Sequence, residues 1–287
     1  MTRTDAFVAH RNLLFTVSYE MLGSAADAED VLQEVWLRWV EVTDEVLDDR
    51  AYLVRITTRL SLNKLRGNAR RREDYVGPWL PEPLLTAPDV ADDVELADSV
   101  STAMLLVLET LPPVERAVFV LREVFDVPYA EIAAAVDKSE PAVRQVAHRA
   151  RSHVEARRPR DRVTPDLHHA ALERFLAAAA TGDFQQLMDV IAPDIVLITD
   201  GGGFKQAALR PILGADKVVR FLTGIYQLST GVELVSVNGA PGLRIELDGE
   251  LEAVATFSFT GDVVTGAYIV RNPHKLGGVL DERVLTR

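Results

Sequence analysis

The sequence predicts a multidomain protein with two all-α helical modules, the second a helix-turn-helix, followed by an α+β domain. A chain of 287 residues exceeds one average domain. Apolar residues recur at helical spacing in the first part of the chain, whereas the alternation typical of strands dominates the last part. Changes in proline, glycine and charge place an α module over 1–72, a linker over 73–95, a second α module over 96–158, a linker over 159–166 and the α+β domain over 167–287.

The composition is that of a globular chain, with 48% hydrophobic and 26% charged residues. The chain has no cysteine, which excludes a disulfide framework, a thiolate zinc site and a cysteine nucleophile, and which fits a reducing compartment. The N-terminus has no apolar signal region, and no uninterrupted apolar run approaches the length of a membrane span. We therefore expect a cytoplasmic protein with no membrane partner and no metal.

The net charge of −12 counts against a nucleic-acid partner, because binding to phosphate depends on Lys and Arg. The charge is unevenly distributed. Residues 73–115 contain acids and no Lys or Arg, whereas residues 50–72 contain bases and no acid, and residues 144–160 contain six Arg and a single Glu. The two basic segments are candidate phosphate-binding surfaces. The acidic linker either mimics nucleic acid or repels the basic modules, and both alternatives stay open.

In the first module, Ser24 followed by Asp27 predicts a helix start. Apolar residues then recur at helical spacing at Ala28, Val31, Leu32, Val35, Trp36 and Trp39. This spacing leaves a polar patch formed by Asp30, Gln33 and Glu34. A solvated helix face and a partner-docking surface both fit this patch.

The next helix turns Leu53, Ile56 and Leu60 inward and carries a basic stripe on another face. The candidate DNA-binding residues of this stripe and its C-terminal extension are Arg55, Arg59, Asn63, Arg66, Arg70 and Arg71. Basic surface is common in proteins, so composition alone leaves both a nucleic-acid role and ordinary solvated surface open.

The second module contains a helix-turn-helix pattern, with helices expected at 129–136 and from Ser139 onward, joined by a turn at Asp137 and Lys138. Pro141 is tolerated in the first turn of the second helix. The residues expected in the core are Val143, Val146, Ala147, Ala150 and Val154. A recognition helix reads bases from its N-terminal turns, so Arg144, Gln145 and His148 are candidate base contacts. The candidate phosphate contacts are Arg149, Arg151 and Arg157, and an ordinary helical hairpin is the alternative.

The C-terminal domain has helical patterns at 167–181, 184–191 and 215–227, and strand patterns at 195–199, 232–238, 243–247, 250–259 and 263–270. Such a domain forms a pocket that hosts enzymes as well as binding modules. The residues available for acid–base chemistry, Asp194, Asp200, Tyr226, Tyr268 and His274, form no recognisable catalytic constellation. Asp200 before three glycines is interpreted as a turn, and His274 as a loop residue.

Three motifs in order across residues 5–158 resemble regions two and four of extracytoplasmic-function (ECF) sigma factors: residues 27–36, residues 55–72, and residues 111–116 leading into the helix-turn-helix. The linker segment 75–83 resembles the signature of the SigJ-like group, whose members carry a C-terminal SnoaL-like domain of the NTF2-like fold. Residues 200–203 and 272–276 resemble that group's two C-terminal motifs. The group usually has Lys directly after the three glycines, whereas here Phe204 stands there and Lys205 follows.

The resemblance implies a sigma factor that binds core RNA polymerase and promoter DNA. Asp30, Gln33 and Glu34 would dock on the β′ clamp helices, with the β flap as a further polymerase contact. The basic stripe would melt and hold the minus-ten element. The minus-thirty-five element would be read by Ser139, Glu140, Arg144, Gln145, His148 and Arg151.

Trp79, Leu80 and Pro81 form an apolar island in the acidic linker, and exposed apolar groups of this kind indicate a docking surface. By resemblance, that surface is on the C-terminal domain, near Asp200, Gly201, Gly202, Lys205, Asn272, Pro273 and Lys275. We expect this domain to modulate initiation, upward or downward, without a cofactor and without catalysis; a small-molecule ligand in its pocket stays open. The alternative functions are a ligand-responsive helix-turn-helix regulator and a SnoaL-like isomerase or cyclase fused to a DNA-binding module.

Overall fold

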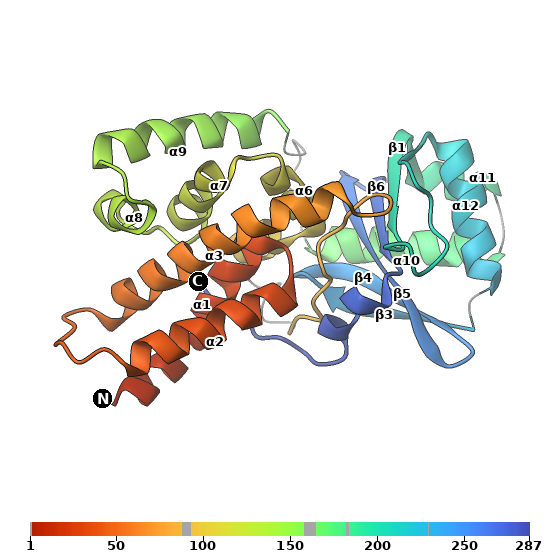
Figure 1. Cartoon of the computed structure of the whole chain (residues 1–287). Helices are drawn as coiled ribbons and strands as arrows, with labels where there is room; N and C mark the ends of the chain where they lie inside the picture. The colour runs from red at the N-terminus through yellow and green to blue at the C-terminus, as the bar shows by residue number, and fades with distance from the viewer. Residues whose placement is uncertain (1, 88–92, 158–164, 182–183, 229) are drawn as a thin grey trace. The chain divides into compact units, whose positions relative to one another are not determined.

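The computed structural model describes residues 2–87, 93–157, 165–181, 184–228 and 230–287 (Figure 1). The chain divides into two compact units. The helical unit comprises Met1–Glu73, Met104–Arg158 and Val284–Arg287, and the sheet unit comprises Asp74–Ala103 and Pro159–Arg283.

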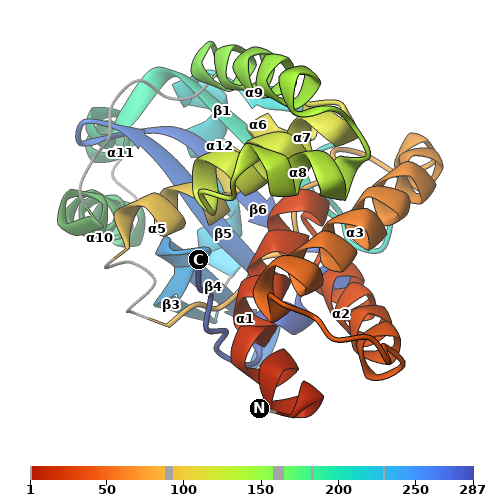
Figure 2. The same ribbon diagram turned by 90° about the vertical axis from the view of Figure 1, so that its left-hand side faces the viewer.

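The helical unit begins with three mutually packed helices, α1 (Arg3–Leu22), α2 (Ala25–Val40) and α3 (Asp49–Glu73), which lie side by side in Figure 2. The expected helix start at Ser24 is confirmed, because its side chain accepts a hydrogen bond from the Asp27 N–H. Their core includes the fully buried side chains Leu14, Tyr19, Leu32, Trp39 and Leu53.

The second part of the helical unit contains most of α6 (Thr102–Glu109), then α7 (Pro113–Phe119), a π-helical stretch (Val120–Val124), α8 (Tyr129–Val136) and α9 (Glu140–Glu155). Asp137 ends α8 in the left-handed conformation, with φ of 56°. Ser139 lies at the N-cap of α9 without a side-chain hydrogen bond, and Pro141 lies in the first turn. The predicted core of α9 is confirmed, because its buried residues are Val143, Val146, Ala147, Ala150 and Val154.

The sheet unit has a six-stranded sheet in the order β2-β1-β6-β5-β4-β3, in which β1 and β6 are parallel and the other neighbours are antiparallel. The strands are β1 (Ile191–Asp200), β2 (Ile212–Leu213), β3 (Gly231–Val237), β4 (Ala240–Leu247), β5 (Glu250–Thr260) and β6 (Val263–Val270). The helices α10 (Pro165–Thr181), α11 (Phe184–Val190) and α12 (Ala215–Leu228) pack on it around an apolar core that includes Leu172, Val218 and Leu197 (Figure 1). The α+β class and every expected element are confirmed, and β2 is an additional strand.

Residues Asp74–Ala103 belong to the sheet unit, whereas the sequence pattern places a linker over 73–95 and begins the second module at 96. This segment includes α5 (Val94–Val100). Leu84 is fully buried, and its N–H donates to Asn238, whose amide nitrogen donates to the Val100 carbonyl. Leu85 forms a β-bridge with Val237 at the end of β3. The segment is therefore docked on the sheet unit along much of its length.

No helix in the described part of the chain combines the length and apolarity that a membrane span requires.

Candidate nucleic-acid interface and linker-docking site

The polar patch predicted on α2 is exposed. Asp30, Gln33 and Glu34 all lie on the solvent face, while Val31 and Leu32 between them are buried. Asp30 forms a salt bridge with Lys64 of α3 at 2.8 Å, and Glu34 pairs with Arg38 one turn later at 2.5 Å. The patch therefore combines charged groups held by exposed ion pairs with an amide, and none of the three side chains is needed in the core.

The basic stripe of α3 lies along one face of that helix. The guanidinium of Arg55 packs over the Tyr52 ring at 4.9 Å, and Arg59, Asn63 and Arg66 are exposed. Arg70 and Arg71 belong to α3, but their side chains lie outside the described residues.

Arg59 connects this stripe to the helix-turn-helix. Its Nη2 donates to the Ala134 carbonyl at 2.8 Å and its Nε to the Ala135 carbonyl at 3.3 Å. Both carbonyls belong to the last turn of α8, where helix geometry leaves them without intrahelical donors and where the helix dipole favours a cation. No local sequence pattern predicts this contact, because the partners are separated by 75 and 76 positions.

A second arginine, which comes from α7, contacts the end of α1 and so also connects the two parts of the helical unit. Arg116 of α7 is buried, and its Nη1 donates to the Met21 carbonyl at the end of α1 (2.9 Å) and to Glu109 (2.8 Å). Burial lowers the pKa of Arg116 to about 10, so the group is charged at neutral pH. The α1–α3 bundle and the helix-turn-helix are therefore joined by two arginines that each cap a helix of the other part.

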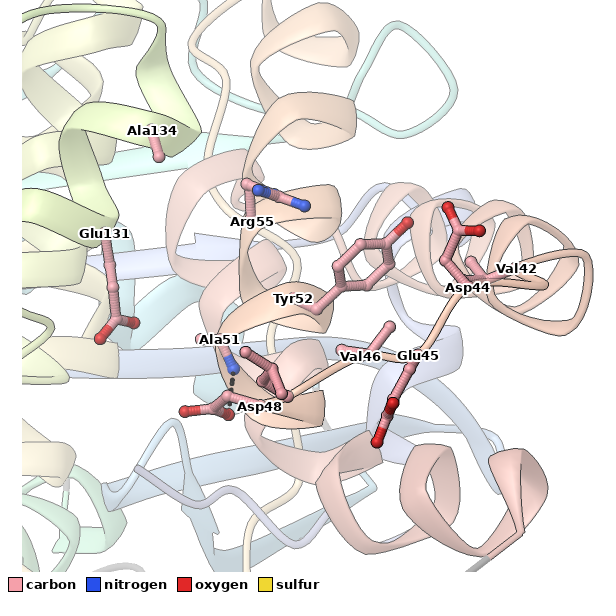
Figure 3. Close-up of a pocket in the computed structure, with 11 residues that line it drawn as sticks. Val42, Asp44, Glu45, Val46, Asp48, Ala51, Tyr52, Arg55, Glu131 and Ala134 are labelled. Atoms are coloured by element: carbon pink, nitrogen blue, oxygen red, sulfur yellow. Dashed lines mark hydrogen bonds between the residues drawn. The ribbon is translucent and has the colours of Figure 1, made fainter.

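Two depressions of opposite charge lie where α3 meets the helix-turn-helix. The first, of about 440 Å³, includes Tyr52, with Arg55 beside it on the adjacent turn of α3 (Figure 3). This depression has a single guanidinium and four carboxylates, which belong to Asp44, Glu45, Asp48 and Glu131. The second, of about 430 Å³, has more cationic than acidic groups in its lining, with Asp137 as its acid. Its polar lining includes Arg59, Asn63, Arg66 and Lys138. Only the second therefore suits a phosphate group.

The predicted reading face of α9 is exposed. Ser139, Arg144, Gln145, His148 and Arg151 are solvent-accessible, and Glu140 is partly so. The arginines of this helix pair with acids of the same unit: Arg144 with Glu140 at 2.5 Å, Arg149 with Glu115 at 3.2 Å and Arg151 with Glu123 at 2.6 Å. Since exposed ion pairs are weak, phosphate or a base edge can replace these carboxylates.

Asp200 is the centre of the linker-docking site. Its carboxylate is fully buried at the end of β1 and accepts hydrogen bonds from the Tyr75 hydroxyl (2.5 Å), the Leu80 N–H (2.9 Å) and Lys275 Nζ (2.7 Å). The interpretation of Asp200 as an ordinary turn residue is therefore wrong. The turn follows it, and the carboxylate itself holds the linker segment.

Lys275 supplies the opposite charge of this site. Its Nζ also donates to the Leu80 carbonyl at 2.6 Å, and it lies 4.1 Å from the ring centre of Trp79 and 4.8 Å from that of Tyr75. Lys275 comes from the short helix η2 (Pro273–Lys275), which directly follows Asn272. A buried ammonium with a carboxylate, a carbonyl and two aromatic rings around it is well compensated.

Tyr75 completes the polar network and was missed as a site residue by the sequence analysis. Its hydroxyl accepts from Asn272 Nδ2 at 2.8 Å while donating to Asp200. Burial raises the pKa of Tyr75, and the hydrogen bond to Asp200 raises it further, since a neighbouring carboxylate disfavours the phenolate.

The glycines after Asp200 leave room for close contacts, Gly202 with Asn272 and the linker residue Tyr75, and Gly201 within its own loop. A Cβ on Gly202, which has φ of 58°, would lie 2.2 Å from Asn272 Nδ2 and 2.8 Å from the Tyr75 hydroxyl. A Cβ on Gly201 would lie 2.2 Å from the Lys205 carbonyl. Both positions therefore require glycine on steric grounds.

The remaining predicted residues of this site separate into two groups. Leu80 and Pro81 are buried and Trp79 is half-buried against Lys275, as a docked linker requires. Lys205 instead pairs with Glu252 at the surface (2.7 Å), and Pro273 is exposed. The structure therefore brings Lys275, and not Lys205, to the linker.

Comparison with known proteins identifies the family. The sigma-70 region 2 model matches residues 6–71 and the sigma-70 region 4 model matches residues 101–154. The chain is 41% identical over 245 residues to the ECF RNA polymerase sigma factor SigJ of Mycobacterium tuberculosis H37Rv, covering 82% of this chain and 78% of the relative. The chain belongs to the family of ECF RNA polymerase sigma factors.

The similarity extends into the C-terminal domain. The crystal structure of Mycobacterium tuberculosis SigJ matches with a TM-score of 0.79 and 34% identity, covering 96% of this chain and 99% of that one. The probable ECF sigma factor SigI of Mycobacterium tuberculosis CDC 1551 is 30% identical over 276 residues, covering 94% and 93% of the two chains. In this sigma factor, α1–α3 thus form region 2 and α7–α9 lie in region 4, and the family's partners are RNA polymerase and promoter DNA.

Proposed function

We propose that this sigma factor directs core RNA polymerase to promoters by reading the minus-thirty-five element with α9 and holding the melted minus-ten element on the basic stripe of α3. The observation that carries this proposal is the exposed face over the N-terminal and middle turns of α9, where Arg144, Gln145 and His148 contribute nothing to the core. Recognition helices read base edges from these turns, and a face of cationic groups is suited to single-stranded backbone. The α2 patch of Asp30, Gln33 and Glu34 would dock on the β′ clamp helices, and region 4 on the β flap.

The test is promoter-specific initiation by the purified chain with core polymerase. We expect start sites at a defined pair of elements with core polymerase and only weak duplex binding without it. If the chain instead binds one operator tightly without polymerase and supports no initiation, it is a helix-turn-helix regulator.

We further propose that region 4 leaves α3 when the promoter is engaged. Arg59 gives its donors to the last carbonyls of α8, so the same donors are not available to a phosphate. The acidic depression beside Tyr52 and Arg55 would also repel a DNA backbone. The arrangement described here is therefore a closed form of the two DNA-facing modules.

For the C-terminal domain, we propose control through the linker and not turnover of a substrate. Of the residues available for acid–base chemistry, Asp200 is committed to Tyr75 and Leu80 of the linker segment, and Lys275 beside it donates to the Leu80 carbonyl. A small ligand would act only through different affinities for the docked and released linker.

The proposed control through the linker is tested by transcription assays with two variants. Trp79→Ala removes the aromatic ring that packs against Lys275, and Val76→Ala changes an exposed linker side chain and is the matched control. We expect Trp79→Ala to change transcription and Val76→Ala to leave it near wild type. A restraint that is lost raises transcription, whereas a lost polymerase contact lowers it. Equal transcription from all three proteins overturns the proposal.

A further inference from the structure

Tyr129, the first residue of α8, contacts the recognition helix although it does not belong to it. The Arg144 guanidinium carbon lies 4.4 Å from the centre of the Tyr129 ring. The Arg122 guanidinium carbon lies 4.9 Å from the same centre. Arg122 is itself held by Asp126 at 2.8 Å and by the Val127 carbonyl at 3.2 Å. The ring is therefore packed against one fixed guanidinium and presents a surface to a second.

We propose that Tyr129 is a positioning residue that holds Arg144 in the rotamer from which it reads a base. This inference rests on the proposed reading role of α9. A guanidinium packed over a ring uses its face, so its N–H groups at the edge stay available. Nη2 bonds Glu140 through one of its two N–H groups, and Nε and Nη1 have no hydrogen-bond partner in the part of the chain that the structure describes. The second N–H of Nη2 therefore leaves one two-donor edge, with either Nε or Nη1, available. A bidentate contact with guanine O6 and N7 needs such a free edge.

The Glu140 ion pair alone does not fix Arg144. The two side chains are 41% and 59% exposed, and an exposed pair one helical turn apart is weak and screened by salt. The aromatic ring is less sensitive to salt and restricts the plane of the guanidinium, which a single carboxylate oxygen does not. Ordering a long side chain before DNA arrives lowers the entropic cost of the base contact.

The experiment is a double-mutant cycle with holoenzyme on two promoters, the preferred one and one with the base pair read by Arg144 replaced. The variants are Tyr129→Leu, Tyr129→Phe, Arg144→Ala and the Tyr129→Leu/Arg144→Ala pair. We expect Tyr129→Leu to reduce discrimination between the promoters by about two- to fivefold, the size of an exposed cation–π contact. Tyr129→Phe keeps the ring and should retain discrimination. In the Arg144→Ala background, Tyr129→Leu should have no further effect on discrimination.

Two results overturn the positioning role. One is an equal loss on both promoters from Tyr129→Leu, and the other is a loss of discrimination that persists in the Arg144→Ala background. Thermal unfolding checks the fold, and Tyr129→Met repeats the cycle if the leucine variant is unstable. If Arg144→Ala alone leaves discrimination intact, α9 does not read through Arg144, and both the proposed reading role and the positioning role fail. The first two results leave that reading role standing.

Discussion

The linker-docking site and the recognition helix contain ion pairs of nearly equal length that have different consequences. Lys275 and Asp200 are 2.7 Å apart with side chains 8% and 0% exposed, whereas Arg144 and Glu140 are 2.5 Å apart with side chains 59% and 41% exposed. Removing one partner of the buried pair leaves the other charge buried and uncompensated, which lowers the unfolding free energy strongly. Breaking the exposed pair costs little, because water solvates both groups. The first contact is therefore structural, and the second can be broken at little cost, as our proposed DNA contact of Arg144 requires.

The largest effect that this comparison predicts is on the buried carboxylate. Asp200→Asn leaves Lys275 buried without its counter-charge, so we expect the sheet unit to lose about 3–5 kcal/mol of unfolding free energy. Asp262→Asn is the matched control, since Asp262 pairs with Arg174 at the surface and its side chain is 68% exposed. That control should cost at most about 1 kcal/mol. Urea unfolding of the full chain measures both, and equal losses would contradict the comparison.

A steric version of the same test uses two glycines with positive φ. Gly202 and Gly249 have φ of 58° and 82°, but a Cβ on Gly249 meets nothing within 4 Å. Gly249→Ala should therefore cost only the backbone strain, roughly 1–2 kcal/mol. Gly202→Ala adds a clash with Asn272 and Tyr75, and we expect roughly 1–3 kcal/mol more. Limited proteolysis should then cut the linker segment faster in Gly202→Ala, and equal cleavage would show that the linker does not depend on this loop.

On the exposed side of the comparison, Arg144→Ala and Arg151→Ala should differ in selectivity. Arg144 lies in the N-terminal half of α9, and its loss should cost about 1–3 kcal/mol at one promoter base pair. Arg151 is held by Glu123, which raises the pKa of its guanidinium, and lies further along the helix, where it faces phosphate in our proposal. Its loss should weaken all promoters alike and reduce the salt dependence. Holoenzyme binding to a set of single-base promoter variants distinguishes the two, and identical profiles would contradict the assignment.

The buried hydroxyl of Tyr75 in the linker-docking site should make the stability of the fold depend on pH. The pKa of Tyr75 is raised above its ordinary value of 10.0, so above pH 10 the unfolded chain releases a proton that the folded chain keeps. Stability conferred by Tyr75 is therefore present below pH 10 and lost as the pH rises, by at most about 1.4 kcal/mol between pH 10 and pH 11. Tyr75→Phe should show a shallower alkaline decline than the wild type. Parallel declines in urea unfolding would show that the hydroxyl is not buried against Asp200.

Local patterns predicted the helices and the core face of α9, because apolar residues that recur about every 3.6 positions can be recognised within one short segment. They indicated only a turn residue at Asp200, because its partners Tyr75 and Lys275 are 125 and 75 positions away. Only the resemblance of two C-terminal motifs to a known group placed Asp200 and Lys275 near the docked linker. The apolar island at Trp79 and Leu80 indicated that a docking surface exists, but not which charges form it. The contact of Arg59 with α8 was missed for the same reason, since carbonyls at the end of any helix carry no residue signature.

The smallest effect on the fold concerns Glu34, and it tests whether an exposed ion pair on α2 has a purpose beyond solvation. Glu34 is 51% exposed and pairs only one turn away with Arg38, so Glu34→Lys should change the unfolding free energy by no more than about 0.5 kcal/mol. Its affinity for core polymerase should nevertheless fall by about fivefold or more if Glu34 is one of the few interface residues whose change costs more than about 1 kcal/mol. Glu41→Lys makes the same charge change at the exposed C-cap of α2, away from the patch, and should leave the affinity near wild type. A competition assay for core polymerase with the three proteins measures this difference. If both variants bind core polymerase as the wild type does, the patch of Asp30, Gln33 and Glu34 is a solvated helix face, and polymerase docks elsewhere on region 2.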